Sequence, residues 1–299
     1  MKLLLLGANG QVGFELRRSL APLGEVVAAT RDGRLVDGGM CETADFDAVD
    51  SLAPLVERIA PDVVVNAAAW TAVDLAEHER EAAFHANAEA PRVLADACAR
   101  RGARLLHYST DYVFDGRGTR PYREDDPTSP LGVYGASKLA GEEAIRASGA
   151  DHAILRTAWV YAPRGKNFLL SMLRLGAERD RLRVVADQVG TPTSAAMIAD
   201  ATARVIAHPL RVSGTWHLTA SGQTSWHGFA EAIFAGAVER GLLPRAPVVD
   251  AISTAEYPTP AARPAYSVLD TMRLQRDFDI VPPDWRDGLA HVLDVPERD

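Results

Sequence analysis

The stretch Tyr134-Gly135-Ala136-Ser137-Lys138 places a phenol and an ammonium four residues apart. Four residues is about one helical turn, so on a helix these two side chains lie next to each other. A phenol with an ordinary pKa of about 10 exchanges protons poorly near neutrality, and a neighbouring cation lowers that pKa by stabilising the phenolate. Such a pair can exchange a proton with a carbonyl or an alcohol. The plain alternative is a chance spacing on an amphipathic helix.

Lysine usage favours the chemical interpretation of this spacing. The chain has only three lysines, Lys2, Lys138 and Lys166, and the other 29 basic residues are arginines. Where only positive charge is needed, this chain therefore uses arginine. The compact ammonium of a lysine is not replaced by the planar arginine fork, so Lys138 is expected to serve a specific contact.

The composition excludes several classes of protein. With 299 residues, of which 47% are hydrophobic and 24% charged, the chain is expected to form one large domain or two coupled ones. A net charge of −8 argues against nucleic-acid and membrane-surface partners. Cys41 and Cys98 have no paired spacing, and no histidine or cysteine cluster has zinc-ligand spacing. With no signal-like segment or long apolar run, we expect a soluble, cytoplasmic protein.

A glycine-rich loop opens the chain. The apolar run Lys2 to Leu6 is typical of a buried parallel strand, and Gly7, Gly10 and Gly13 follow it with G-x-x-G-x-x-G spacing. These glycines let the backbone turn tightly and approach a pyrophosphate at the start of a helix that runs to about Leu20. A merely close strand–helix contact is the alternative, but the strand–loop–helix order indicates a dinucleotide-binding unit.

The end of the second predicted strand, Glu25 to Ala29, bears on the choice of cofactor. An enzyme strict for NAD should carry an acidic residue there to bind the adenosine ribose, and this chain has Thr30 and Arg31 instead. This favours a 2′-phosphate and hence NADPH, although Asp32 lies close by and Arg31 could simply be solvated. Asp45 stands before a helical apolar pattern from Phe46 onward, where it could cap the helix or border an adenine pocket.

Three more predicted strands deliver candidate site residues at their carboxyl ends, where open α/β sheets bind ligands. After the strand at 63–66 come the small residues Ala67, Ala68 and Ala69. The strand at 104–109 is followed by the polar pair Thr110 and Asp111, and the strand at 152–157 by Trp159. The alanines could let a cofactor lie against backbone, Thr110 could bind a substrate carbonyl, and Trp159 could form an aromatic wall for a sugar or base. Ordinary core packing is the alternative for the alanines and the tryptophan.

The order of elements predicts the fold class. Strands alternate with helices, among them 76–101 in two segments broken near Ala90-Pro91, 168–178 and one from about Ala195. This pattern predicts an α/β protein with a Rossmann-type doubly wound parallel sheet in residues 1–185. Residues 186–299, with a short strand at 215–218, a helix at 226–240 and a proline-rich segment at 244–264, predict a smaller C-terminal α/β substrate domain. The boundary is approximate, and the two domains are expected to interleave.

Taken together and in this order, the motifs carry a resemblance to a known family. The glycine loop, Asn66-Ala67-Ala68-Ala69, Ser109 to Phe114, and Tyr134 to Glu142 resemble the extended short-chain dehydrogenases. Arg156 to Tyr161, Asp187 to Thr193, and Arg263-Pro264 with Ser267 and Asp270 narrow this to the dTDP-4-dehydrorhamnose reductase family, over nearly the whole chain.

The resemblance implies a reaction and a set of roles. The family reduces the C4 ketone of dTDP-6-deoxy-L-lyxo-4-hexulose to dTDP-L-rhamnose with a nicotinamide cofactor, for cell-envelope glycans. It implies that Tyr134 donates a proton, Thr110 helps to hold the oxygen, and Lys138 binds the nicotinamide ribose and lowers the Tyr134 pKa. The resemblance further implies that Gly10, Gln11 and Val12 meet the pyrophosphate, that Asp45, Phe46, Ala69, Thr71 and Tyr108 line the cofactor, and that Asp111 and Trp159 contact the sugar. Arg263 is a further candidate, for the substrate diphosphate.

Two other functions stay open from the sequence. One is a nucleotide-sugar epimerase or dehydratase of the same extended family, which would return its NAD unchanged. The other is a non-catalytic regulatory subunit similar to that of methionine adenosyltransferase, against which the retention of Thr110, Tyr134 and Lys138 argues. The preference for NADPH over NADH, the stringency for dTDP and the presence of a homodimer also stay open.

One departure from the family pattern concerns a metal. Some of these reductases bind Mg²⁺ at a dimer contact through glutamates at three positions of the chain. Glu15 matches the first of these positions. The second is Ala196, whose methyl group cannot coordinate a cation that demands oxygen ligands. Asp294 and Glu297 are loose candidates for the third. We therefore expect no metal site and no Mg²⁺ requirement.

Overall fold

The apolar runs predicted as buried strands form a single parallel sheet in the computed structural model, which describes residues 1–295. Leu3 to Leu6 are each 0% exposed, because helices cover both faces of the sheet. Across the sheet the seven strands follow the order β11 (Gly214–His217), β6 (His152–Thr157), β5 (Arg104–Thr110), β4 (Val63–Asn66), β1 (Lys2–Leu6), β2 (Glu25–Thr30) and β3 (Glu42–Thr43). All neighbours in this order pair in parallel, which confirms the predicted fold class.

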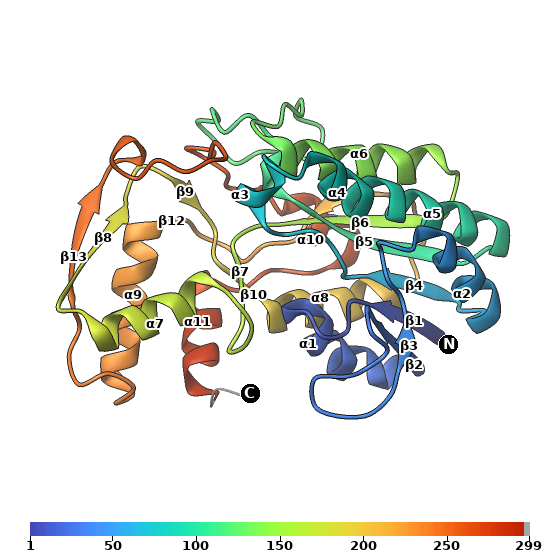
Figure 1. Ribbon diagram of the computed structural model, residues 1–299, viewed down its shortest axis with the longest axis horizontal. Helices are drawn as coiled ribbons and strands as arrows, with labels where there is room; N and C mark the ends of the chain where they lie inside the picture. The colour runs from blue at the N-terminus through green and yellow to red at the C-terminus, as the bar shows by residue number, and fades with distance from the viewer. Residues whose placement is uncertain (296–299) are drawn as a thin grey trace.

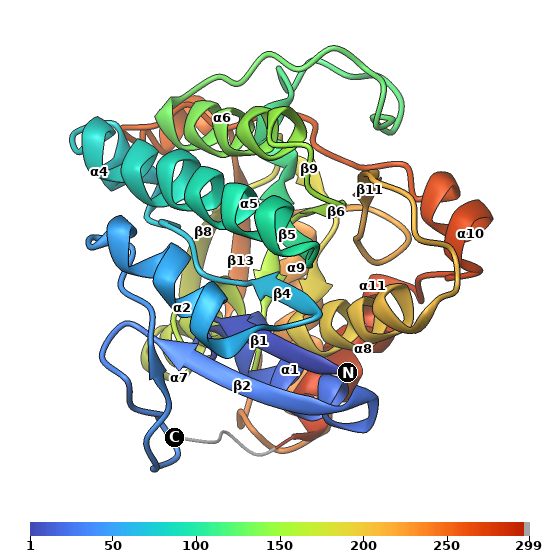
Figure 2. The same ribbon diagram turned by 90° about the vertical axis from the view of Figure 1, so that its right-hand side faces the viewer.

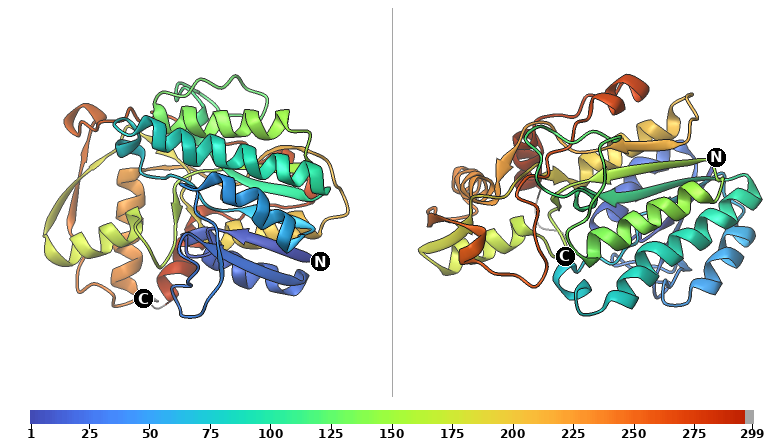
Figure 3. Two further views of the ribbon diagram at one scale, coloured as in Figure 1. Left: turned by 45° about the vertical axis from the view of Figure 1, so that its right-hand side comes forward. Right: turned by 90° about the horizontal axis from the view of Figure 1, so that it is seen from above.

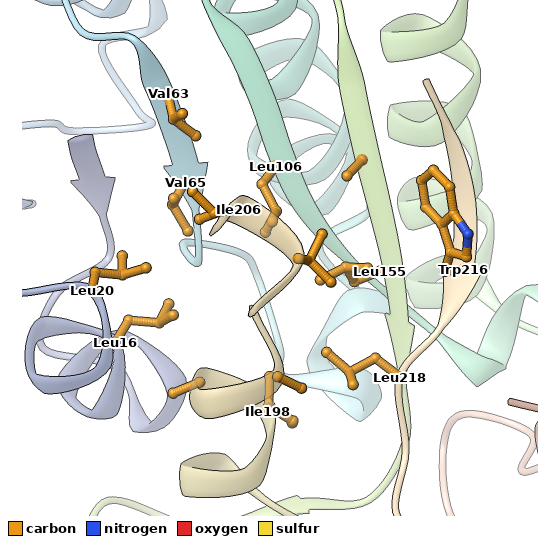
Figure 4. Packing of buried hydrophobic residues seen from close by; sticks show 14 of the residues in the cluster. Leu16, Leu20, Val63, Val65, Leu106, Leu155, Ile198, Ile206, Trp216 and Leu218 are labelled. Atoms are coloured by element: carbon orange, nitrogen blue, oxygen red, sulfur yellow. The ribbon is translucent and has the colours of Figure 1, made fainter. Parts of the chain in front are cut away.

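Helices pack on the two faces of this sheet in separate apolar cores (Figures 1 and 2). On one face lie α1 (Gln11–Leu20), α8 (Ala195–Ala207) and α10 (Met272–Phe278), and Leu16, Leu20 and Ile198 pack there against Val65 and Leu155 of the strands (Figure 4). On the other face lie α2 (Leu52–Ile59), α5 (Ala90–Arg101) and α6 (Val133–Ala147). The periodic apolar residues of these helices therefore cover the sheet as the pattern requires.

A second lobe lies beyond the carboxyl ends of the strands, to the left in Figure 1. Its core is built by α7 (Phe168–Glu178), α9 (Trp226–Glu239), α11 (Trp285–Asp294) and the parallel pair β8 (Arg181–Val185) and β13 (Val248–Ile252). The two lobes interleave along the chain, because β8 belongs to this lobe whereas α8 and β11, which follow it, return to the main sheet. The view from above in Figure 3 shows this lobe standing next to the end of the sheet.

The remaining strands and helices are short. Two small strand pairs are β7 (Val160–Tyr161) with β10 (Thr193–Ser194), and β9 (Val189–Gly190) with β12 (Thr224–Ser225). The short helices are α3 (Val73–Ala76), α4 (Arg80–Phe84), a π-helical turn η3 (His85–Glu89), and the 3₁₀ turns η1 (Ala21–Leu23), η2 (Val49–Ser51), η4 (Asp111–Val113) and η5 (Thr254–Glu256). Within residues 1–295, no helix combines the length and the apolar character needed to cross a bilayer.

Candidate active site

The glycine loop lies at the point where the strand order reverses, because β1 has β2 on one side and β4 on the other. Gly7 has a φ of +77°, and the Gly10 amide donates to the Gly7 carbonyl at 2.9 Å. A Cβ on Gly13 would lie 2.0 Å from that same carbonyl oxygen, so only glycine fits there. A Cβ on Gly7 would lie 2.7 Å from the Ala68 nitrogen, so the glycine loop and the alanine loop after β4 touch through backbone.

The start of α1 suits a pyrophosphate. Helix α1 begins at Gln11 after Gly10, and no side chain caps its first amides, which include that of Val12. Uncapped amides at a helix N-terminus attract anions, so the cradle predicted from the glycines fits a dinucleotide in this structure.

Gln11 is held by a residue that the sequence did not single out. Asn167 donates from its side-chain nitrogen to Gln11 Oε1 at 2.8 Å, and its Oδ1 accepts from the Leu170 amide and caps α7. This hydrogen bond joins the second lobe to the cofactor loop. Only the position of Asn167 before an apolar helical run, where a capping residue is expected, could have indicated it.

At the adenosine end, Asp32 does not occupy the place of a ribose-binding acid. Its Oδ1 accepts from the Thr30 hydroxyl at 3.1 Å and from the Arg34 amide at 3.2 Å, which turns the carboxylate into its own loop. These two hydrogen bonds lower the pKa of Asp32. Arg31 is 75% exposed and lies 3.7 Å from Asp45. Both residues are exposed at the end of β2, but the Asp32 carboxylate is bonded within its own loop, whereas the Arg31 side chain extends into solvent.

Two neighbouring predictions are modified by the structure. Asp45 accepts from the Asp47 amide at 3.1 Å and so caps a turn, because α2 begins only at Leu52. The Phe46 ring is 6% exposed and packs in the core under α2. In the loop after β4, Ala69 and Thr71 are both exposed.

Thr110 and Asp111 lie at the carboxyl end of β5, as predicted. The Thr110 hydroxyl donates to Asp111 Oδ1 at 3.0 Å and accepts from the Tyr112 amide at 3.2 Å. Asp111 is 2% exposed, and burial raises its pKa to about 6 although the nearby hydroxyls of Ser267 and Thr110 lower it. Thr110 must release Asp111 before it can donate to any other oxygen.

Helix α6 carries Tyr134 on its first turn and is fixed by close backbone contacts. Glu77 accepts from the Val133 amide at 2.8 Å and so caps the helix start. A Cβ on Gly135 would lie 2.2 Å from the Tyr112 carbonyl oxygen, and one on Gly141 would lie 2.1 Å from that of Asn87. These two glycines of the motif therefore let the helix approach its neighbours, which sets the position of the tyrosine.

The expected effect on the Tyr134 pKa is wrong in direction. Burial raises the pKa of Tyr134 to about 12, the neighbouring Thr110 hydroxyl opposes this shift, and the Asp111 charge adds to it. Lys138 does not counter the burial, because its ammonium group is engaged elsewhere: it lies 2.6 Å from the Tyr108 carbonyl oxygen and 3.2 Å from His107 Nε2. A raised pKa keeps the phenol protonated, which is the state that a proton donor needs.

Lys138 is buried at 2% exposure, and burial lowers its pKa to about 8 while the charge of Glu142 opposes the shift. Its partner His107 is 1% exposed and lies opposite Asn66 on the adjacent strand, with 3.0 Å between His107 Nδ1 and Asn66 Nδ2. Burial lowers the pKa of His107 well below its ordinary value. The sequence analysis did not recognise His107. Tyr108, predicted to line the cofactor, turns its ring to the other face and hydrogen-bonds to Thr202 at 2.6 Å.

A buried ion pair lies one turn further along α6. Glu142 is 0% exposed and accepts from Arg156 Nε at 2.9 Å and from Nη2 at 2.8 Å. Burial alone would raise the pKa of Glu142, but the hydrogen bonds and charge of Arg156 outweigh burial and lower it. With Tyr134 and Lys138, Glu142 continues one face of the helix at four-residue spacing.

Trp159 has a strained backbone conformation, with a φ of +48°. Its ring stacks on that of Trp226 with 3.5 Å between centroids and 3° between planes. A Cβ on Gly190 would lie 2.5 Å from the Trp159 indole, so this glycine of the Gly-Thr-Pro-Thr turn makes room for the ring. Trp226, at the start of α9, was not identified from the sequence.

Arg263 is held by an ion pair with α3 and by a carbonyl of its own segment. It pairs with Asp74 of α3 at 2.9 Å and donates to the Ala261 carbonyl at 3.2 Å. The Ala261 amide donates to the same Asp74 oxygen at 3.2 Å. The segment around residue 261 is therefore held against the sheet-bearing lobe, close to Tyr112 and Tyr134.

Comparisons with known proteins agree with this geometry. Residues 1–297 match the family model described as the RmlD substrate binding domain. A dTDP-4-dehydrorhamnose reductase of Burkholderia thailandensis is 51% identical over 297 residues, which cover 96% of each chain.

Two solved structures have the same fold over nearly their whole length. A dTDP-4-dehydrorhamnose reductase of Clostridium acetobutylicum has a TM-score of 0.89 at 37% identity, covering 98% of this chain and 99% of the other. One of Bacillus anthracis, in complex with NADP, has a TM-score of 0.88 at 34% identity, covering 97% and 98%. The family predicted from the motifs is thereby confirmed: the chain belongs to the dTDP-4-dehydrorhamnose reductase family.

Proposed function

We propose that the protein reduces the C4 ketone of dTDP-4-dehydro-6-deoxy-L-mannose (dTDP-6-deoxy-L-lyxo-4-hexulose) to dTDP-L-rhamnose. NADPH supplies the hydride when bound, and the reaction is part of dTDP-rhamnose synthesis for cell-envelope polysaccharide. The observation that carries the proposal is that Thr110, Tyr134 and Lys138 stand together at the carboxyl end of β5 and the start of α6. The family and the NADP-bound relative support it. We place the enzyme in the cytoplasm.

Each of these residues has its own role in the reduction. Tyr134, kept protonated by its raised pKa, gives its proton to the C4 oxygen as negative charge develops there. Thr110 touches both Tyr134 and Asp111 and orients the phenol and the ketone oxygen. Lys138 binds the nicotinamide ribose, and the glycine loop with Gln11 and Val12 holds the pyrophosphate.

The second lobe is proposed to hold the sugar nucleotide. Trp159, backed by Trp226, forms a wall for the sugar, next to the Asp111 carboxylate. Arg263 binds the diphosphate, for which it exchanges its Asp74 partner for phosphate oxygens. The sheet-bearing lobe would then hold the dinucleotide, and the reacting groups would meet between the lobes.

The direct test is NADPH oxidation that depends on the dTDP-ketosugar, with the product identified as dTDP-L-rhamnose. Stoichiometric NADPH consumption supports the proposal. Conversion of a sugar nucleotide without net cofactor consumption would instead identify an epimerase or dehydratase. No turnover, together with binding to another enzyme's catalytic subunit, would identify a regulatory protein.

Arg31→Ala tests how the cofactor is chosen. Because Asp32 is turned into its loop and Arg31 is exposed, we expect the variant to weaken NADPH binding about tenfold while NADH binding changes little. Titration of cofactor fluorescence measures both affinities. Arg58→Ala, which removes an exposed arginine paired with Glu42, is the matched control and should alter neither. Equal losses for both cofactors would show that Arg31 does not bind the 2′-phosphate.

Removal of divalent ions tests the metal prediction. Glu15 lies 3.7 Å from Arg18, and Asp294 pairs with Arg240 at 2.6 Å, so both carboxylates have cationic partners. Glu297 lies outside the described residues. Because Ala196 offers no oxygen ligand, we propose that a chelator leaves both ketosugar reduction and the molecular mass in solution unchanged. Activity lost to the chelator and restored by Mg²⁺, or a dimer that dissociates, would contradict this.

A further inference from the structure

We propose that Asn66 fixes His107 in the tautomer that carries its proton on Nε2, and that this N–H makes His107 a positioning residue that favours the uncharged form of Lys138. The functional part rests on the proposed function, in which Lys138 binds the cofactor ribose. Asn66, His107 and Lys138 form a buried line from β4 through β5 to α6.

The amide orientation of Asn66 is set by the backbone. Its Oδ1 accepts from the Ala68 amide at 3.1 Å, so Nδ2 must face His107. The reversed amide would point an N–H at the Ala68 N–H. Because Asn66 can only donate toward His107, Nδ1 of the ring has to accept, and the neutral ring carries its proton on Nε2.

The Nε2–H tautomer of His107 disfavours the charged form of Lys138. His107 Nε2 lies 3.2 Å from Lys138 Nζ, and an N–H on that nitrogen can donate only to an amine lone pair. An ammonium at the same place would set donor against donor. The Tyr108 carbonyl at 2.6 Å accepts from Nζ in either state and fixes its position, although as an acceptor it bonds the ammonium more strongly than the amine.

Among the groups around Lys138, His107 is the one that disfavours the charged form of its side chain. The groups facing Lys138 are Tyr134 and Glu142 from its own helix, with His107 and the Tyr108 carbonyl from β5. Glu142 favours the charged form, but Arg156 of β6 neutralises that carboxylate through two hydrogen bonds. Burial acts in the same direction as His107 and lowers the pKa of Lys138 to about 8.

The first experiment reads the tautomer directly. Long-range ¹H–¹⁵N correlation spectra of the histidine rings, recorded on the full chain without substrate, distinguish Nε2–H from Nδ1–H. His107 is assigned by the loss of its signals in His107→Leu. We expect a neutral Nε2–H ring from about pH 5 to about pH 9. An Nδ1–H ring or an imidazolium in that range would overturn the proposal.

The second experiment measures NADPH affinity against pH and does not require the ketosugar. Wild-type affinity is expected to fall as Lys138 loses its proton, near pH 8. In His107→Leu the midpoint of this fall should rise by about one pH unit, because the opposing N–H is gone. His152→Leu is the control, since His152, at the start of the neighbouring strand β6, is also buried but its ring hydrogen-bonds to the nearby Ala150 carbonyl.

Asn66→Asp keeps the histidine and reverses its tautomer. A carboxylate would accept from Nδ1–H, so the Nε2 lone pair would face Lys138 and accept from its ammonium. We expect the ring signals to report Nδ1–H and the NADPH midpoint to rise. In this variant or in His107→Leu, NADPH could instead bind more weakly at every pH with the midpoint unchanged. That result would show that His107 has only a packing role. Both readouts stay valid if the ketosugar is not the substrate.

Discussion

Replacing Tyr134 with phenylalanine is expected to reduce the turnover number by a factor of about 10² or more, with NADPH bound as before. The ring and its edge contact with Tyr112, at 5.7 Å between centroids, stay in place, whereas the transferable proton is lost. Because the pKa of Tyr134 is raised to about 12, wild-type enzyme holds this proton throughout the neutral range. Steady-state rates with the ketosugar and a cofactor titration give the two quantities.

Tyr112→Phe is the matched control for this experiment. The Tyr112 side chain is, like that of Tyr134, partly buried, its ring meets that of Tyr134 edge-on, and burial raises its pKa as well. Removing the Tyr112 hydroxyl should change turnover far less, because Tyr134 donates the proton. A Tyr134→Phe enzyme that keeps more than about a tenth of its turnover would assign the proton to another group, for which buried Asp111 would be the first candidate.

Much of the sheet could be predicted from the sequence because its strands are buried on both faces. The strands at 2–6, 63–66 and 152–157 and the helix at 168–178 have the bounds expected from their apolar runs. β13 was missed because it lies in a proline-rich segment and pairs with β8 across more than sixty residues of chain. The helix expected over 76–101 is broken at 77–79 rather than near Ala90-Pro91, where α4 continues through the π-helical turn at His85–Glu89 into α5.

The site residues that the sequence located belong to contiguous motifs. Tyr134 and Lys138 share a helix face, and the glycines follow a strand, so local spacing alone indicates their roles. His107, Trp226 and Asn167 contact the site only through residues at least thirty positions away in sequence, such as Lys138, Trp159 and Gln11. No local pattern carries such pairings. The direction of the Tyr134 pKa depended on burial, which spacing does not report.

Glu142→Leu is expected to lower the free energy of unfolding by about 3–5 kcal/mol, because it leaves a buried charge without its partner. Arg156 is 2% exposed and cannot turn to water, whereas Arg146, the other cation on Glu142, is 39% exposed and can. Urea denaturation of the enzyme without cofactor measures the loss. Glu143→Leu, an exposed neighbour on the same helix, is the control and should cost under about 1 kcal/mol.

The double variant Glu142→Leu with Arg156→Leu separates an unpaired charge from lost packing. Replacing both partners of a buried pair with apolar residues is often neutral, so the double variant should recover most of the stability that Glu142→Leu loses. Because the pKa of Glu142 is lowered in the folded state, its contribution is complete at neutral pH and is lost as the pH falls below its ordinary value of 4.5. The difference between wild type and Glu142→Leu should therefore shrink in acid. A difference that persists unchanged below this range, or a double variant no more stable than Glu142→Leu, would show that packing rather than charge makes Glu142 necessary.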